Sequence, residues 1–196
     1  LGADLLLGLV VHFVTMKMRV NNAGVMTKVR ETGEYELGYQ RGYTKNFLEY
    51  CLDDTNPLLM YLIQEKEAID VERLKEYREA GNQKNVRGQE PRRYDFQAIL
   101  LTMQELEAAC CVPSILGPEL RNILILGEKK SGEYYTTEDI NILFTLAQES
   151  AIAIENAKLF DEAVNKSRQL EKINEQLEYS KNLLMNALRE TEIANK

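Results

Sequence analysis

The last third of the chain, residues 137–193, constrains the fold most, because it contains neither glycine nor proline and therefore predicts one uninterrupted helix. From 137 to about 154, apolar residues recur every three or four positions, which indicates that this part packs against a globular core. Beyond Asn156 the apolar residues thin to a single heptad seam with Lys166 and Ser180 as its polar members. The predicted dimer seam consists of Ala163, Leu170, Ile173, Leu177, Leu184 and Ala187.

A helix of this length would extend roughly 85 Å, which is longer than a domain is wide. Its far end therefore cannot be buried within its own chain. The partner that the sequence predicts is a second copy of the same helix, so we expect a homodimer through the C-terminal helix. Because the seam is only a few heptads long, a solvated tail remains the alternative.

Composition limits the possible functions. With 196 residues, of which 44% are hydrophobic, the chain can hold one sizeable core and an appendage. The net charge of −7 argues against a nucleic-acid partner. Three cysteines do not form a disulfide framework, so we expect a reducing, cytoplasmic compartment. The apolar start, residues 1–14, is too short to span a bilayer, so no direct membrane insertion is expected. The absence of an initial methionine and the end within a helix indicate a piece of a larger protein.

The segments before residue 137 predict an α+β domain with an antiparallel sheet and helices packed on it. We expect helices up to residue 18, at 47–52, from Asn56-Pro57 onward, at 71–80 and at 96–106. Strands are expected at 25–29, 35–40, 68–69, 109–116 and 121–126. Pro113 predicts a bulge or an unpaired side in its strand. Residues 123–126 show no polar alternation, which predicts a strand covered on both faces.

No residues form a recognisable catalytic or metal-binding constellation. The one histidine, His12, lies inside an apolar helical stripe, where a packed side chain is the better explanation. Cys110 and Cys111 lack the spacing of a zinc or redox pair. Because neighbouring strand residues point to opposite faces, we expect only one of the two to face the core.

The chain has ten tyrosines and no tryptophan. Phenol rings combine an apolar body with a hydrogen-bonding tip, so some of them are candidates for lining a small-molecule pocket. These ligand-pocket candidates are Tyr39, Tyr43 and Tyr61, together with Cys111 and the nearby Tyr50. Half-buried structural tyrosines explain the pattern equally well.

The polar stretch 81–93 contains four cations, Lys84, Arg87, Arg92 and Arg93. They predict either a basic lip over an anionic ligand or an ordinary solvated loop, and the loop is the simpler interpretation.

Residues 123–160 resemble the C-terminal half of a GAF domain. The resemblance is carried by a strand ending in Leu-Gly-x-Lys at 126–129 and a Ser-Gly turn at 131–132. A Tyr-Thr-x-Glu-Asp run at 135–139 and an Ala-Ile-x-Asn-Ala run at 153–157 follow. Upstream, residues 22–26 and 56–58 match more loosely. The resemblance therefore covers about residues 1–160, with the first helix clipped.

This resemblance implies a sensory and dimerisation module, with a GAF-like sensor domain at 1–157 and a coiled-coil signalling helix at 158–196. Residues 187–196 are similar to the segment before the phosphoacceptor histidine of sensor histidine kinases, which implies a bacterial two-component kinase as the parent and an output domain in the same chain. The fragment itself is then not an enzyme.

The resemblance also limits which classes of ligand the domain could bind. No cysteine precedes a histidine as in bilin-binding members, and only His12 is available as a haem ligand, so no cofactor is evident and the small-molecule ligand is unknown. The alternatives are a ligand-free dimerisation spacer of a cyclase or transcription activator, and a thiol-based reductase of GAF fold.

Overall fold

The computed structural model describes residues 2–29, 31–45, 47, 50–83 and 94–194. The chain divides into two units, Leu1–Glu155 and Asn156–Lys196, of which the second consists of helix. The four cations of the predicted basic lip, Lys84, Arg87, Arg92 and Arg93, lie outside the described residues.

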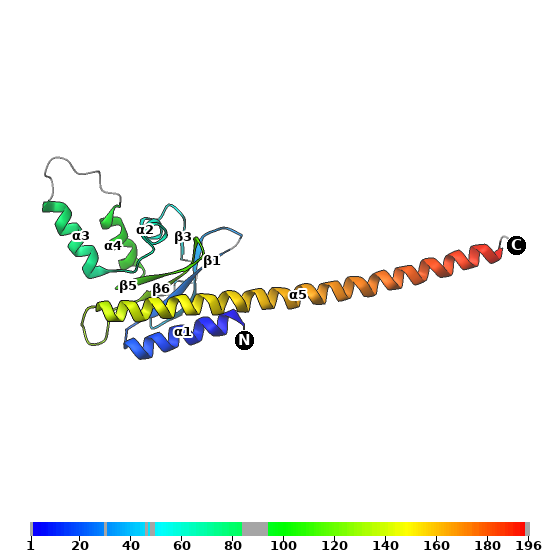
Figure 1. Cartoon of the computed structure of the whole chain (residues 1–196), viewed down its shortest axis with the longest axis horizontal. Helices are drawn as coiled ribbons and strands as arrows, with labels where there is room; N and C mark the ends of the chain where they lie inside the picture. Colours follow the sequence, from blue (N-terminus) through cyan, green and yellow to red (C-terminus); the bar gives the residue numbers. More distant parts are fainter. Residues whose placement is uncertain (1, 30, 46, 48–49, 84–93, 195–196) are drawn as a thin grey trace. The chain divides into compact units, whose positions relative to one another are not determined.

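The first unit contains an antiparallel sheet with helices on both faces (Figure 1). Its strands are β1 (Ala23–Lys28), β2 (Tyr35–Arg41), β3 (Cys51–Leu52), β4 (Ile69–Asp70), β5 (Cys110–Leu116) and β6 (Glu119–Leu126). The helices are α1 (Ala3–Met18), α2 (Pro57–Glu65), α3 (Val71–Gln83), α4 (Phe96–Glu105) and α5 (Thr137–Ala194). The strand order is β3-β2-β1-β6-β5-β4, with every neighbouring pair antiparallel. The predicted α+β class and the long C-terminal helix are confirmed.

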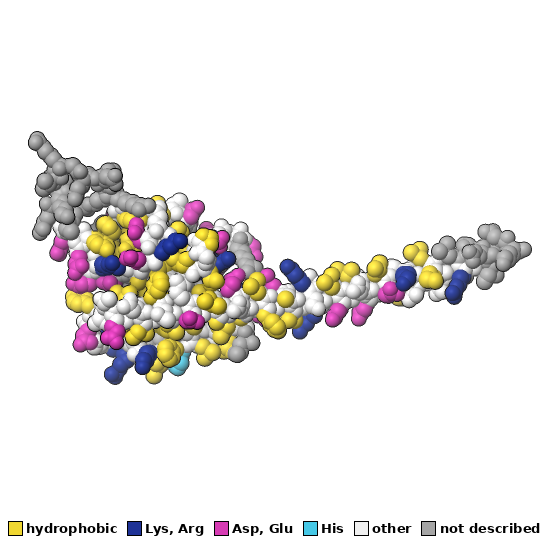
Figure 2. All heavy atoms as spheres, in the orientation of Figure 1, with side chains coloured by type: hydrophobic (Ala, Val, Ile, Leu, Met, Phe, Trp, Pro, Cys, Tyr) yellow, Lys and Arg dark blue, Asp and Glu magenta, His cyan; other side chains and the backbone are white. Residues whose placement is uncertain are grey.

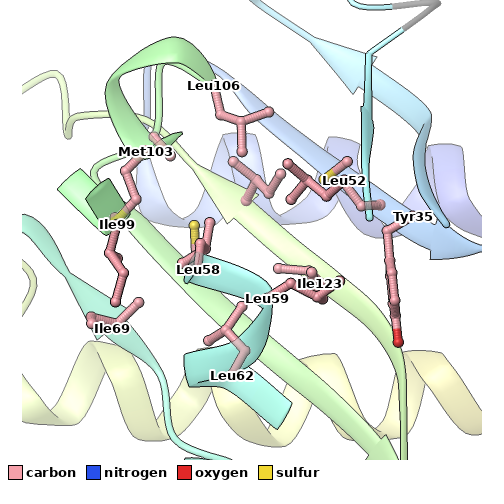
Figure 3. Packing of buried hydrophobic residues seen from close by; sticks show 14 of the residues in the cluster. Tyr35, Leu52, Leu58, Leu59, Leu62, Ile69, Ile99, Met103, Leu106 and Ile123 are labelled. Carbon is pink, nitrogen blue, oxygen red and sulfur yellow. The ribbon is translucent and has the colours of Figure 1, made fainter. Parts of the chain in front are cut away.

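The central strand β6 supplies side chains to two separate cores. Ile123 and Ile125 belong to a core that also contains α2 and α4, whereas Leu124 and Leu126 belong to a core that contains α1 and the first part of α5. Leu58, Leu59 and Leu62 of α2 lie with Ile99 and Met103 of α4 in the first core (Figure 3). The absence of polar alternation at 123–126 therefore reflects a strand that is buried on both faces, as predicted.

Local signals place two of the helices that cover the sheet. The Asn56 side chain accepts hydrogen bonds from the backbone N–H groups of Leu58 and Leu59, and Pro57 occupies the first helical position of α2. Asp95 caps α4 in the same way, through Gln97 and Ala98. Each cap satisfies donors that would otherwise have no partner at the helix start.

The helix predicted at 47–52 is wrong. Cys51 and Leu52 instead form β3, which pairs with the edge of β2 through Tyr35 and Glu36. The two-residue strand is too short to show a period of two, so only the tertiary pairing reveals it.

The packed position predicted for His12 is also wrong. Its side chain is exposed, and its Nδ1 accepts a hydrogen bond of 2.6 Å from Arg41 Nη1 on β2. The buried residues of α1 are Leu7, Val11 and Val14. Because α1 is apolar on most of its circumference, the sequence pattern did not separate its buried face from its exposed one.

Both adjacent cysteines are buried, which corrects the expectation that only one faces a core. Cys110 lies in the α1–α5 core and Cys111 in the α2–α4 core, because helices cover both faces of β5. Burial raises the pKa of the Cys111 thiol to about 12 and raises that of Cys110 as well. Cys51 is exposed on β3, which is separated from β5 by three strands.

A compact network fixes the start of α5. Lys129 Nζ lies 2.5 Å from Asp139 Oδ2, and both side chains are largely buried. The backbone N–H of Thr136 donates to the same carboxylate at 2.8 Å, and the backbone N–H of Asp139 donates to Thr136 Oγ1 at 3.2 Å. This reciprocal arrangement makes Thr136 the N-cap of α5. Burial opposes ionisation of Asp139, but the hydrogen bonds from Lys129 and Thr136 prevail and lower its pKa.

Replacing Asp139 with Asn is expected to lower the free energy of unfolding by about 1–2 kcal/mol at neutral pH, because the helix loses its cap and its ion pair. The folded carboxyl has a lowered pKa, so its stabilisation is present above the usual carboxyl pKa and is lost as the pH falls through the folded value. Urea titrations should therefore show a difference between Asp139→Asn and the native chain that shrinks at about pH 3. An equal difference at both pH values would contradict this explanation.

A thiol-specific reagent is expected to modify Cys51 rapidly in the native protein and to spare Cys110 and Cys111, because burial excludes the reagent and raises the pKa of both thiols. A colorimetric thiol titration with and without denaturant measures this difference. Cys51→Ser should abolish the rapid phase. Rapid modification of a second thiol in the native state would contradict the two-core arrangement.

Candidate functional site

The predicted pocket residues do not converge on one cavity. Tyr43 and Tyr61 pack with Cys111 in the core of α2 and α4. The Tyr43 ring lies edge-on to Phe47, with 5.2 Å between ring centroids. The Tyr61 ring is 5.2 Å from that of Tyr94. Burial raises the pKa of Tyr43 and raises that of Tyr61 to about 12, so both phenols remain neutral.

Tyr39 lies on the opposite face of the sheet. The register of β1 and β2 shifts between Val25 and Met26, so that Val25 pairs with Tyr39 and Met26 with Leu37. This bulge leaves Gly38 as the additional residue and reverses the alternation of β2. Tyr39 consequently packs on Gly8 of α1, where an added Cβ would lie 3.2 Å from its ring. Ligand binding by Tyr39, Tyr43, Tyr61 and Cys111 stays a prediction.

A different cavity lies at the end of the sheet where β1 begins and β6 ends. Its volume is about 690 Å³, within the range of small-molecule sites. Five segments far apart in sequence form its wall: the turn before β1, the segment after β2, the β4–α3 junction, the end of α4 with the residues that follow it, and the loop from β6 to α5. Its charged residues are Asp70, Glu72, Lys75, Glu107, Glu128, Lys129 and Glu133, and its aromatic residues are Tyr134 and Tyr135.

Internal hydrogen bonds hold one wall of this cavity. Glu107 accepts hydrogen bonds from the backbone N–H and the hydroxyl of Thr44. The amide nitrogen of buried Asn22 donates to the backbone oxygen of Glu107 at 3.1 Å. Gly127 is required beside Asn22, since a Cβ there would lie 1.7 Å from the amide oxygen. The hydrogen bond from the Thr44 side chain is the main cause of the lowered pKa of Glu107.

Glu72 and Lys75 of α3 form the opposite wall. Glu72 Oε2 is enclosed and accepts no hydrogen bond from the residues that the structure describes. Lys75 Nζ lies 4.0 Å from it, beyond hydrogen-bond distance, and 5.9 Å from the centroid of the Tyr134 ring. The sequence pattern gave no signal for these residues, because their arrangement depends on segments that meet only in the fold.

The first unit connects its sheet to α5 beside a bulge in the β5–β6 ladder. The register shifts so that Ser114 pairs with Asn122 and Ile115 with Leu120, which leaves Arg121 of β6 as the additional residue. Pro113 itself pairs with Ile123, so the bulge lies in the neighbouring strand and not in the strand of Pro113. The N–H of Ile115 donates to Gln148 Oε1 at 2.8 Å, and Ser114 Oγ donates to the Ala147 backbone oxygen at 2.9 Å. These two hydrogen bonds attach β5 directly to the first part of α5.

In the second unit, the predicted seam residues are exposed. Leu170, Ile173, Leu177 and Leu184 each have 57–64% of their surface accessible, and Ala163 and Ala187 are exposed as well. Figure 2 shows hydrophobic side chains at intervals along this helix, between charged and polar ones. Lys166 and Ser180, the polar members of the seam, are also exposed.

The first unit exposes apolar side chains on two helices. On α1 these are Leu5, Leu9, Phe13 and Met16, spaced by four, four and three residues. On α5 they are Ile142 and Ile152. Both helices bury their other faces in the same core, so these side chains project away from the sheet.

Searches for metal sites and membrane spans among the described residues were negative. No group of three or more His, Cys, Asp or Glu side chains is placed to hold a metal ion there. None of the described helices combines the length and the apolar character that crossing a membrane requires.

No family model and no curated protein matches the sequence. Solved structures do match. A GAF/HD-domain protein from Geobacter sulfurreducens has a TM-score of 0.59 at 12% identity, covering 82% of this chain and 97% of its own. Residues 122 to 287 of a methyl-accepting chemotaxis protein match with a TM-score of 0.59 at 11% identity. The match covers 81% of this chain and 92% of the other. A type II free methionine-R-sulfoxide reductase from Thermoplasma acidophilum matches with a TM-score of 0.51 at 13% identity. The match covers 79% of this chain and 93% of the other. The chain has the fold of GAF domains.

Proposed function

We propose that the chain is a regulatory sensor module that dimerises through α5 and passes a signal along it to an output domain of the same chain. The exposed seam of α5 is the observation that carries this proposal. Each large apolar side chain contributes about 1.5–3 kcal/mol when it moves from water into a packed interface. A second copy offers the same seam at the same spacing, so the pairing is self-complementary.

The polar members of the seam support a signalling role over a purely structural one. Lys166 and Ser180 occupy the d positions that alternate with Ile173 and Ala187. Polar residues at such positions reduce the stability of a coiled coil. A less stable pair can change its register, rotation or helicity under a few kcal/mol of differential ligand affinity.

The output domain that we propose is a histidine kinase, on the sequence similarity of residues 187–196 alone. The chemotaxis receptor among the structural neighbours supports a signalling role in general. A ligand-free dimerisation spacer is the competing function, and it would show no ligand-dependent change in stability. We place the protein in the cytoplasm, because its three cysteines are unpaired.

We propose that the fragment is not an enzyme. One structural neighbour is a sulfoxide reductase, so the question is whether the three thiols of this chain could act together in a thiol-based reaction. Cys110 and Cys111 are fully buried on opposite faces of β5, and exposed Cys51 lies on β3, which three strands separate from β5. A thiol relay needs accessible cysteines that can reach one another, which this arrangement does not provide.

Replacing Leu177 with Glu is expected to convert the dimer to a monomer, because two carboxylates would meet in the apolar seam. Sedimentation equilibrium of the 196-residue chain measures the change. Tyr179→Glu is the matched control: Tyr179 is equally exposed and lies two residues away, off the seam, so this variant should remain dimeric. A native chain that sediments as a monomer at high concentration would contradict the proposal.

Replacing Lys166 and Ser180 together with Leu is expected to stabilise the dimer by about 1.5–3 kcal/mol for each buried side chain. Thermal unfolding at fixed protein concentration, followed by circular dichroism, measures this gain. In the full-length parent the same variant should hold the output in one state, because the helix pair loses its freedom to shift. An unchanged unfolding midpoint would show that neither residue lies in the interface.

A further inference from the structure

We propose that the cavity at the end of the sheet binds a small zwitterion of the amino-acid class, with its ammonium group on Glu72 and its carboxylate on Lys75. This inference rests on the proposed sensory function and identifies where its ligand binds. The site differs from the tyrosine-rich core that the sequence first indicated.

The enclosed oxygen of Glu72 is the first observation. Buried carboxylate oxygens in folded proteins normally accept hydrogen bonds, and Glu72 Oε2 accepts none from the described residues. The side chain as a whole is 41% accessible, and its ion-pair partner Lys75 lies 4.0 Å away. Two other carboxylates of the cavity already accept hydrogen bonds within the fold: Asp70 Oδ1 from the backbone N–H of Arg73, and Glu107 from Thr44. Glu72 therefore retains acceptor capacity for a ligand.

The neighbouring ammonium defines the ligand further. Lys75 Nζ is 4.0 Å from Glu72 Oε2, so a simple amine bound to Glu72 would be repelled by Lys75. A simple carboxylate is also disfavoured, because the described lining carries five acidic and two basic side chains. A molecule with both groups pairs each of its charges with an opposite one.

The remaining wall accommodates an apolar side chain. Val71, Leu100 and Ala108 line the cavity beside the ring of Tyr134. Such a mixture of convergent charged groups and apolar surface is typical of small-molecule sites.

The position of the cavity explains how a bound ligand would affect α5, the proposed output helix. Lys129, Tyr134 and Tyr135 of its wall belong to the loop that immediately precedes α5. Lys129 also pairs with Asp139 in the first turn of α5, and the Tyr135 hydroxyl donates to the Gly127 backbone oxygen at 2.6 Å. A ligand that orders this loop therefore stabilises the start of α5.

Thermal unfolding of the 196-residue chain with millimolar amounts of each free amino acid tests the proposal. We expect at least one apolar amino acid to raise the unfolding midpoint, since a ligand that binds only the folded state stabilises it. For leucine the matched probes are 4-methylpentanoate, which lacks the ammonium group, and 3-methylbutylamine, which lacks the carboxylate. Neither should give the same shift.

Variants assign the binding to the named residues. Glu72→Gln and Lys75→Met should each raise the dissociation constant roughly tenfold or more, because each removes a charged hydrogen-bond partner. Glu79→Gln on the same helix, outside the cavity, should leave it unchanged. Circular dichroism verifies that each variant is folded.

No shift with any amino acid, or unchanged binding in Glu72→Gln, would overturn the proposal. Either result would leave the proposal of a dimer through α5 unaffected. Conversely, a monomeric chain that still binds an amino acid would refute the proposed output route and leave the site intact.

Discussion

Burial of both faces of one antiparallel sheet is the constraint on which the rest of the structure depends. Strand β6 lies between β1 and β5, and its consecutive apolar residues alternate between two cores. Helices α2 and α4 cover one face, and α1 with the first part of α5 covers the other. Without α5 the second core would lose Leu143, Ala147 and Ile154, so the helix that we propose as the output element is also a structural part of the first unit.

The proposed output route would depend on contacts at the beginning of α5. The cap at Thr136, the ion pair between Lys129 and Asp139, and the hydrogen bonds from Ser114 and Ile115 of β5 to Ala147 and Gln148 all lie within the first four turns of the helix. A helix is stiff along its axis because every backbone group is bonded within it. In the proposed output route, a change at its start would be carried along it instead of being absorbed locally.

The sequence predicted features that depend on local pattern. The absence of glycine and proline indicated α5, the Asn-Pro pair located the start of α2, and the unbroken apolar run at 123–126 indicated a strand covered on both faces. The heptad spacing predicted a seam on α5, and its large apolar side chains are exposed in the single chain. Each of these signals lies within a few turns of one element.

Features that depend on tertiary pairing were missed. The edge strand β3 exists only because β2 offers an open edge to Cys51 and Leu52, and Tyr39 faces α1 only because a bulge at Gly38 reverses the alternation. His12 lies on the surface because α1 is apolar on several sides. The cavity of Glu72 and Lys75 joins five segments, and no spacing within any one of them indicates a site.

The central claim is a helix pair in which identical residues of two chains face each other. Single cysteines introduced in turn at residues 168–178, in a Cys51→Ser background, test it by the yield of disulfide-linked dimer under mild oxidation. The account predicts maximal cross-linking at residues 170, 173 and 177, with minima between them. Uniformly low yield, or a maximum on the opposite side of the helix, would contradict it.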